Sequence, residues 1–124
     1  MMLIPSELKS SPIHGIGIYT TEAVLKGTLI WRLEPDFERL LDENIVKTWP
    51  QFQQDFVYKY SYPHPKNPSL LILEVDNGRF MNHSLTPNTD FNTVYEGYAL
   101  IDLPAGTEMT CNYNEFHPGF VMTL

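Results

Sequence analysis

Two stretches of the chain alternate apolar and β-branched residues in the way that β-strands do. In the first stretch, runs at Ile16–Thr20 and residues 28–33 flank a Lys-Gly turn. In the second, runs at residues 98–101 and 108–113 flank an Ala-Gly turn. Each stretch predicts a hairpin-like unit of strand, turn and strand, and together they indicate an all-β frame.

The segment between these units carries a helical pattern. Apolar side chains recur near helical spacing over residues 37–49, where Asp42 can cap a turn and Pro50 ends the pattern. Residues 52–62 follow. Phe52 and Phe56 keep helical i, i+4 spacing, and the alternating Tyr58, Tyr60 and Tyr62 then predict an extended aromatic segment. After a proline-rich loop, the apolar run at residues 70–75 predicts a buried strand. The middle of the chain is therefore expected to be a short helical insert in a mostly β domain.

Composition limits the chain to one folded domain. Its 124 residues fit a single domain, and a chain that is 43% hydrophobic and 13% aromatic can form a modest core. Ten prolines and seven glycines predict many turns and short elements, so an all-helical bundle is not expected.

The charge of the chain bears on its partners. Eight Lys or Arg against fifteen Asp or Glu give a net charge of -7 and a pI near 4.9. A protein that neutralises nucleic-acid phosphates carries clustered basic residues, so direct binding to nucleic acid is not expected. An acidic chain instead favours a basic partner.

Cysteine usage and the apolar runs indicate a cytoplasmic protein. The one cysteine, Cys111, cannot form an internal disulfide or a cysteine-rich zinc site, and it suits a reducing compartment. The first residues lack the features of a signal peptide, and no apolar run is long enough to cross a bilayer. We therefore interpret the N-glycosylation pattern at residues 82–84 as accidental.

Isolated motifs exclude several common chemistries. Gly15-Ile16-Gly17 lacks the third glycine of a dinucleotide fingerprint, because Thr20 stands in its place and no helical pattern follows. The two glycines alone fit either a tight bend or the close approach of a ligand to the backbone. The four histidines lack metal-ligating spacing, so no metal site is expected. Neither Cys111 nor any serine has the sequence context of a nucleophile.

The order of the remaining motifs is more specific. RFMNHSLTPN at residues 79–88, then AGTEMTCNY at residues 105–113, follow the G-x-G of the first strand unit. In this order they resemble the SET-domain family of S-adenosylmethionine-dependent protein lysine methyltransferases, in particular its short SET-only members. The resemblance implies a mostly β, β-clip-like fold of several small sheets, with a pseudoknot near the C-terminus and a short helical insert. It divides the chain into a first SET part at residues 11–35, a variable insert at 36–69, a second SET part at 70–113 and a short tail at 114–124.

The resemblance also implies roles for individual residues. Tyr113 matches the catalytic tyrosine of the family, and S-adenosylmethionine is the implied cofactor. The residues implied in cofactor binding are Ile16, Gly17, Arg79, Phe80, Asn82, His83 and Phe116. The residues implied in the substrate channel are Phe91, Cys111, Tyr58 and Tyr60. The Arg79 guanidinium could instead pair with an internal carboxylate, and each insert tyrosine could instead pack on the core.

Three departures from the family pattern shape these expectations. The tail after the catalytic tyrosine lacks zinc-binding cysteines, so Phe116 and Phe120 are the aromatic candidates to close the site, and a homodimer could supply a further cover. The residue before that tyrosine is Asn where relatives carry Asp. Cys111 and Phe91 offer no hydroxyl where relatives carry a residue that limits methylation, so we expect transfer of more than one methyl group.

Three functions remain open at this point. The resemblance favours an enzyme that methylates a lysine amine of a basic protein, because Asn82, His83 and Tyr113 are all intact. The alternative is a catalytically weak or inactive SET-fold module that binds a peptide or the cofactor. A purely structural β domain of a related clip-like fold is the third, and it predicts no affinity for the cofactor.

Overall fold

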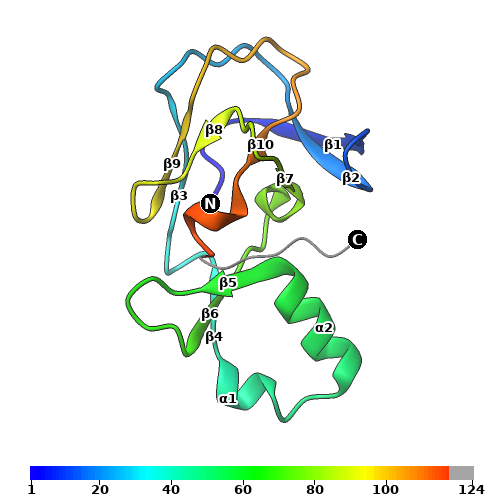
Figure 1. Cartoon of the computed structure of the whole chain (residues 1–124), viewed down its shortest axis with the longest axis vertical. Helices are drawn as coiled ribbons and strands as arrows, with labels where there is room; N and C mark the ends of the chain where they lie inside the picture. The colour runs from blue at the N-terminus through cyan, green and yellow to red at the C-terminus, as the bar shows by residue number, and fades with distance from the viewer. Residues whose placement is uncertain (118–124) are drawn as a thin grey trace.

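The structure, a computed structural model, describes residues 1–117. The strands in this part of the chain form four small sheets. The strands are β1 (Ser6–Ser10), β2 (Ile16–Thr20), β3 (Leu29–Arg32), β4 (Arg39–Asp42), β5 (Ser61–Pro63), β6 (Leu70–Leu73), β7 (Asn82–His83), β8 (Thr89–Asp90), β9 (Glu96–Ala99) and β10 (Thr110–Cys111). The helices are α1 (Glu43–Val46), α2 (Gln51–Tyr60) and the 3-10 helices η1 (Asn77–Phe80) and η2 (Tyr113–Glu115). Figure 1 shows β4, α1, α2 and β5 of the insert, together with β6, below the other strands. The expected mostly β fold with a helical insert is confirmed.

The prediction of two separate hairpin-like units is wrong, because the first stretch of the chain pairs with the second. β2 pairs with β1, and β3 pairs antiparallel with β9. The bridges Tyr19 to Glu108 and Val24 to Leu103 continue that antiparallel alignment. The two connecting segments therefore run side by side over the top of the molecule in Figure 1. Buried Val24 and Leu103 explain the difference, since each connection covers the apolar side chains of the other.

The prediction of a helix over residues 37–49 is also wrong for its first half, which contains a strand. β4 lies in that range and pairs antiparallel with β6, and α1 adds only one turn after it. Asp42 does cap that turn, as predicted, by accepting from a backbone N–H two residues further on at 2.9 Å. Residues 39–42 form a strand because the apolar strand β6 is available to pair with them, and this pairing overrides their helical spacing. Val46 of α1 is buried against Val57 and Leu71.

The aromatic segment predicted as extended is mostly helical. Tyr58 and Tyr60 both lie in α2, and only Tyr62 lies on a strand, β5. The rings of Phe56 and Tyr60, four residues apart, have their centroids 5.0 Å apart, a contact that helical spacing produces. The buried strand predicted over residues 70–75 is confirmed by β6 and its antiparallel partners β4 and β5.

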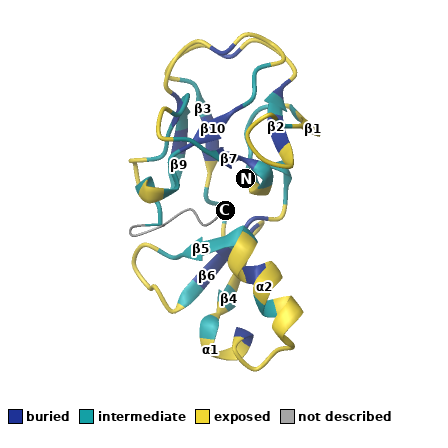
Figure 2. Cartoon of the chain, turned by 45° about the vertical axis from the view of Figure 1, so that its right-hand side comes forward, coloured by how far each residue is buried: buried dark blue, intermediate teal, exposed yellow. Residues whose placement is uncertain are grey.

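Parallel pairing of β7 with β10 brings the two most specific motifs together. Asn82 lies opposite Thr110 and His83 lies opposite Cys111. β10 is shorter than the strand predicted over residues 108–113, because the chain turns into η2 directly after it. The main buried cluster packs around this pair, as Figure 2 shows in dark blue. Its members are Ile18, Val24, Ile30, Trp31, Met81, Ala99, Leu103, Met109 and Cys111.

Candidate functional site

Asn82 joins three segments that are far apart in the sequence. Its buried side-chain Nδ2 donates to the His14 carbonyl at 3.1 Å, to the Ile16 carbonyl at 3.4 Å and to the Glu108 carboxylate at 3.0 Å. Because β7 is paired with β10, these bonds hold the G-x-G segment against both motifs of the second SET part. The amide therefore fixes the backbone of the G-x-G segment in place.

Glu108 is a site residue that the sequence reasoning did not single out. Its carboxylate accepts hydrogen bonds from the Ser11 hydroxyl at 2.8 and 2.9 Å as well as from Asn82. A Cβ added at Gly17 would lie 2.3 Å from Glu108 Oε2. A glycine is thus needed at position 17 because the Glu108 side chain lies against it. The sequence had offered a tight bend or a ligand contact as the reason for this glycine. The available signal was the glutamate in AGTEMTCNY.

Tyr113 is held at its backbone and at its hydroxyl by β7 and the residue just before that strand. Its backbone N–H donates to His83 Nδ1 at 3.1 Å, and its hydroxyl donates to the Met81 carbonyl. The His83 and Tyr113 ring centroids are 5.1 Å apart. Burial raises the pKa of the Tyr113 phenol above its usual value, so the hydroxyl stays protonated at neutral pH and acts as a hydrogen-bond donor.

A cavity of about 580 Å³ opens beside Tyr113, within the size range of ligand pockets. The sequence-predicted site residues on its wall are Tyr58, Tyr60, Arg79, Phe91, Cys111, Tyr113 and Phe116. The others lie outside it: Ile16, Gly17, Phe80, Asn82 and His83. The predicted set therefore divides into a cavity group and a group around β7, and Tyr113 contacts both through its ring and its backbone N–H.

Aromatic rings form much of the cavity wall. The Phe116 ring lies 5.1 Å from that of Tyr62, 5.7 Å from that of Phe91 and 5.8 Å from that of Tyr113, measured between centroids. Gly97 seats the Phe91 ring, because a Cβ there would lie 2.4 Å from a ring carbon. Phe116, one of the two closing candidates, thus lies in the aromatic wall of the cavity. Phe120, the other closing candidate, lies outside the described residues.

Arg79 stacks on aromatic rings. Its guanidinium carbon is 5.4 Å from the Tyr60 ring centroid and 5.0 Å from that of Phe80, and the Tyr60 and Phe80 rings contact each other at 5.9 Å. The alternative prediction of an internal carboxylate partner finds no support among residues 1–117, whose ion pairs do not include Arg79. These contacts hold its positive charge at the cavity wall.

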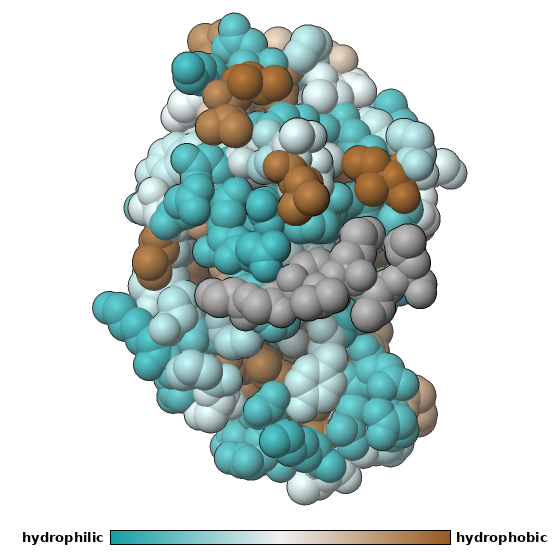
Figure 3. Space-filling model, viewed as in Figure 1, coloured by the Kyte–Doolittle hydropathy of each residue, from teal (hydrophilic) through white to brown (hydrophobic). Residues whose placement is uncertain are grey.

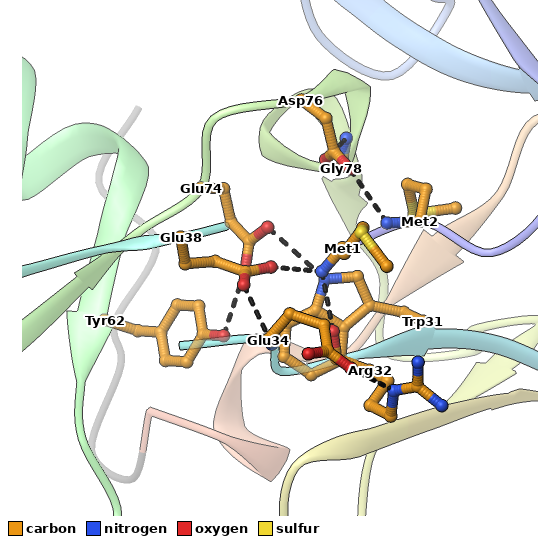
Figure 4. A network of polar contacts seen from close by, with 10 residues as sticks. All are labelled: Met1, Met2, Trp31, Arg32, Glu34, Glu38, Tyr62, Glu74, Asp76 and Gly78. Carbon is orange, nitrogen blue, oxygen red and sulfur yellow. Dashed lines mark hydrogen bonds and ion pairs between the residues drawn. The ribbon is translucent and has the colours of Figure 1, made fainter. Parts of the chain in front are cut away.

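A second polar network, centred on Glu74, also reaches the cavity wall (Figure 4). Glu74 Oε1 accepts from the Tyr62 hydroxyl at 3.0 Å, and Oε2 accepts from the Trp31 indole N–H at 3.3 Å. The Met1 amino group forms an ion pair with the neighbouring Glu38. Burial raises the pKa of Glu74 from 4.5 to about 7, and the charge of Glu38 adds to this while the Met1 amino group opposes it.

This raised pKa predicts a pH-dependent gain in stability for Glu74→Gln. The folded protein holds a proton that the unfolded chain releases, so stability falls as pH rises from 4.5 to about 7 and is constant above that. The shift corresponds to about 3 kcal/mol at most. Glu74→Gln should therefore melt higher than wild type at about pH 8, with a smaller difference at about pH 5. Thermal unfolding of both proteins, with the exposed-loop variant Glu22→Gln as control, checks this, and a difference independent of pH would contradict it.

The described residues contain neither a cluster of metal ligands nor a membrane-spanning helix. In residues 1–117, no three His, Cys, Asp or Glu side chains gather as metal ligands would. No helix in that part of the chain is long and apolar enough to span a membrane.

Comparison with known proteins identifies the family. The family model for the SET domain matches residues 15–114, so the chain belongs to the SET-domain family. No curated protein sequence matches the chain. The resemblance first seen in RFMNHSLTPN and AGTEMTCNY is therefore confirmed at the level of the family.

Solved structures show the same fold. A humanized mutant of the Chaetomium thermophilum Polycomb Repressive Complex 2 matches with a TM-score of 0.66 at 15% identity, over 94% of this chain. The match covers 16% of that chain, so this protein corresponds to a small part of it. A candidate histone methyltransferase from Plasmodium falciparum matches with a TM-score of 0.62 at 16% identity, over 90% of this chain and 95% of that one. At these identities the likeness shows the shared fold.

Proposed function

We propose that the protein is a protein lysine N-methyltransferase that uses S-adenosylmethionine. The observation that carries the proposal is the parallel pairing of β7 with β10, which joins Asn82 and His83 to Tyr113 at the wall of an aromatic cavity. Family membership and the candidate histone methyltransferase among its structural neighbours support the same reaction class. Membership of the family is shown, and the methyltransferase activity and its protein substrate are what we propose.

The residues around the site fit the proposed cofactor. The G-x-G backbone at Ile16 and Gly17 is fixed by Asn82, and Arg79 holds a positive charge suited to a carboxylate. We assign Ile16, Gly17, Arg79, Phe80, Asn82, His83 and Phe116 to cofactor binding. When bound, S-adenosylmethionine supplies a methyl group activated by a sulfonium cation.

The cavity residues have the properties that methyl transfer to lysine needs. A lysine ammonium has an ordinary pKa near 10.4 and must lose a proton before its nitrogen can attack. Burial among Phe91, Cys111 and Phe116 disfavours the charged form of an entering amine. The Tyr113 hydroxyl, protonated and fixed by Met81, can orient the nitrogen. The main contribution of the protein is then positioning, which can lower a barrier by several kcal/mol.

We further propose a basic protein as the substrate. The net charge of -7 gives long-range attraction for a basic tail, which would weaken as salt rises. Figure 3 shows a largely hydrophilic face with separate apolar patches, as suits contact with a charged partner. A homodimer that covers the cavity remains a proposal, as does a cytoplasmic location.

Cofactor affinity is the first test of this function. A ligand that binds only the folded state raises the melting temperature. S-adenosylmethionine and its demethylated product should each raise the midpoint of the wild-type protein. A shift without any methyl transfer would favour the inactive binding module, and the absence of any shift would contradict cofactor use.

The cavity also predicts the degree of methylation. Cys111 and Phe91 line it without a hydroxyl that would hold a water or the amine, so wild type should add more than one methyl group. Cys111→Tyr should shift the product towards monomethyl-lysine, because it adds a phenol and fills space in the wall. Mass spectrometry of a peptide product under excess donor measures this, with Cys111→Ala as the size control. A wild-type product that stays monomethylated would refute the prediction.

A further inference from the structure

The Glu74 carboxylate is part of the cavity wall and has hydrogen-bonding capacity to spare. Its residue is only 7% exposed and it lines the cavity together with Trp31 and Tyr62. From residues 1–117, each of its two oxygens accepts one hydrogen bond, from the Trp31 indole or the Tyr62 hydroxyl (Figure 4). A carboxylate can accept about four hydrogen bonds, so both oxygens can accept more.

The charge of this carboxylate is not balanced within the cavity wall. The nearby Met1 amino group pairs with Glu38 and donates to the Arg32 carbonyl at 2.7 Å. None of the ion pairs in residues 1–117 includes Glu74. Residues 118–124 contain no Lys, Arg or His. With Glu38 and Glu74 both ionised, the Met1 amino group has two carboxylates near it.

Aromatic rings lie next to the carboxylate and between it and Tyr113. The Trp31 ring lies 6.5 Å from that of Tyr62 and 5.6 Å from that of Phe91. The chain of contacts from Glu74 to the proposed catalytic tyrosine runs through Tyr62 and then Phe116. The carboxylate and these rings therefore line the cavity as one connected group. Ring faces and a carboxylate both attract cations, and the attraction is stronger where water is excluded.

We propose that Glu74, Trp31, Tyr62 and Phe91 form a subsite for a second basic side chain of the protein substrate, beside the lysine that is methylated. This extends the proposed function, since it specifies a substrate with a basic residue near the target lysine. A cation in the subsite would form the ion pair that Glu74 lacks in the described chain. Lysine and arginine share the chemistry that the subsite requires.

The subsite should bind cations more tightly as pH rises. With the pKa of Glu74 raised to about 7, mainly by burial, its carboxylate forms above that pH. Other ionisable groups surround it, so the effect must be isolated by substitution. Those near Glu74 are the Met1 amino group, Glu38, Tyr62, Asp76 and Cys111. Those elsewhere on the cavity wall are Tyr58, Lys59, Tyr60, His64, Arg79, Tyr95, Glu96, Tyr113, Glu115 and His117.

The indole N–H of Trp31 offers a direct probe of Glu74. The chain has two tryptophans, and Trp49, outside the cavity wall, provides an internal reference. In a nitrogen-15 spectrum, the Trp31 indole signal should move with a midpoint at about pH 7. Glu74→Gln should remove this midpoint while Glu22→Gln preserves it. Tyr62→Phe should raise it, because the Tyr62 hydroxyl bond favours the charged carboxylate.

Binding is tested with n-butylammonium and n-butylguanidinium, and with uncharged n-pentanol as control. The two cations should move the Trp31 signal, with affinity about tenfold higher at about pH 8.5 than at about pH 5.5, and the comparison of the two identifies the preferred side chain. Glu74→Gln should remove that pH dependence, and pentanol should cause no such change. Equal binding by wild type and Glu74→Gln, or a Trp31 signal that does not titrate, would overturn the subsite.

A peptide assay connects the subsite to the substrate. Among peptides with one lysine, kcat/KM should fall about tenfold when a neighbouring basic residue becomes Gln, and Glu74→Gln should reduce that preference. Equal kcat/KM for both peptides would overturn the substrate role. A failure of the proposed function is distinguishable, because it would leave every peptide unmethylated while the Trp31 titration and cation binding persist.

Discussion

Tyr113→Phe should reduce methyl transfer by about 100-fold or more while leaving the fold intact. The substitution removes only the hydroxyl, which donates to the Met81 carbonyl at the cavity wall. The ring contacts with His83 and Phe116 do not depend on that oxygen. Lost orientation of the amine should therefore appear mainly in kcat, measured with radiolabelled methyl donor.

The control for this variant separates chemistry from binding. The rise in melting temperature caused by the methyl donor should persist in Tyr113→Phe, because its backbone N–H can still donate to His83. Tyr98→Phe, which changes a tyrosine outside the cavity wall, should keep wild-type activity. A Tyr113→Phe enzyme with wild-type kcat would show that the hydroxyl has no role in catalysis.

Gly17→Ala should produce the second large effect, on stability and on cofactor binding together. The new Cβ would lie 2.3 Å from Glu108 Oε2 and 3.1 Å from the Ser11 Cβ. Either Glu108 moves away from Asn82 or the G-x-G backbone shifts. Overpacking of this kind costs about 1–3 kcal/mol, so thermal unfolding should show a clear drop in midpoint.

Gly17→Ala should also weaken cofactor binding. The Asn82 side chain donates to the Glu108 carboxylate and to the Ile16 carbonyl, and the new Cβ would displace one or both. Isothermal titration with the demethylated product of the donor measures this. Gly27→Asn, outside the G-x-G segment and the cavity wall, is the matched control, since a Cβ at Gly27 meets nothing within 4 Å and Asn tolerates positive φ better than most residues. If Gly17→Ala bound the product as tightly as wild type, the β7 and G-x-G group would not be the cofactor site.

The family and the fold class could be predicted because the sequence keeps its motifs in order. RFMNHSLTPN and AGTEMTCNY contain the residues that β7, β10 and η2 place side by side. Pairing between distant segments could not be derived from local pattern, which is why the two strand units were assigned as hairpins. β3 and β9 pair across 64 to 69 positions, from Arg32 with Glu96 to Leu29 with Tyr98, and Tyr19 and Glu108 are 89 positions apart.

Local propensity failed in the insert for a related reason. Residues 39–42 have helical spacing, but pairing with Leu70–Leu73 decides their conformation. Alternation of Tyr58 and Tyr60 suggested a strand, yet both belong to α2. Two acidic residues of the site were missed altogether. Glu108 stood inside a recognised motif, whereas Glu74, within an apolar run, gave no sign that Trp31 and Tyr62 would bond to it.

The most direct test of the central claim is a mass spectrum of a basic, lysine-containing peptide incubated with the protein and S-adenosylmethionine. The proposed function predicts a mass increase of one methylene unit per transfer, located on lysine by fragmentation, that requires the donor. Tyr113→Phe, still folded and still stabilised by the donor, should leave the peptide largely unmodified. A wild-type protein that binds the donor yet methylates no lysine in a panel of basic peptides and histones would contradict the account.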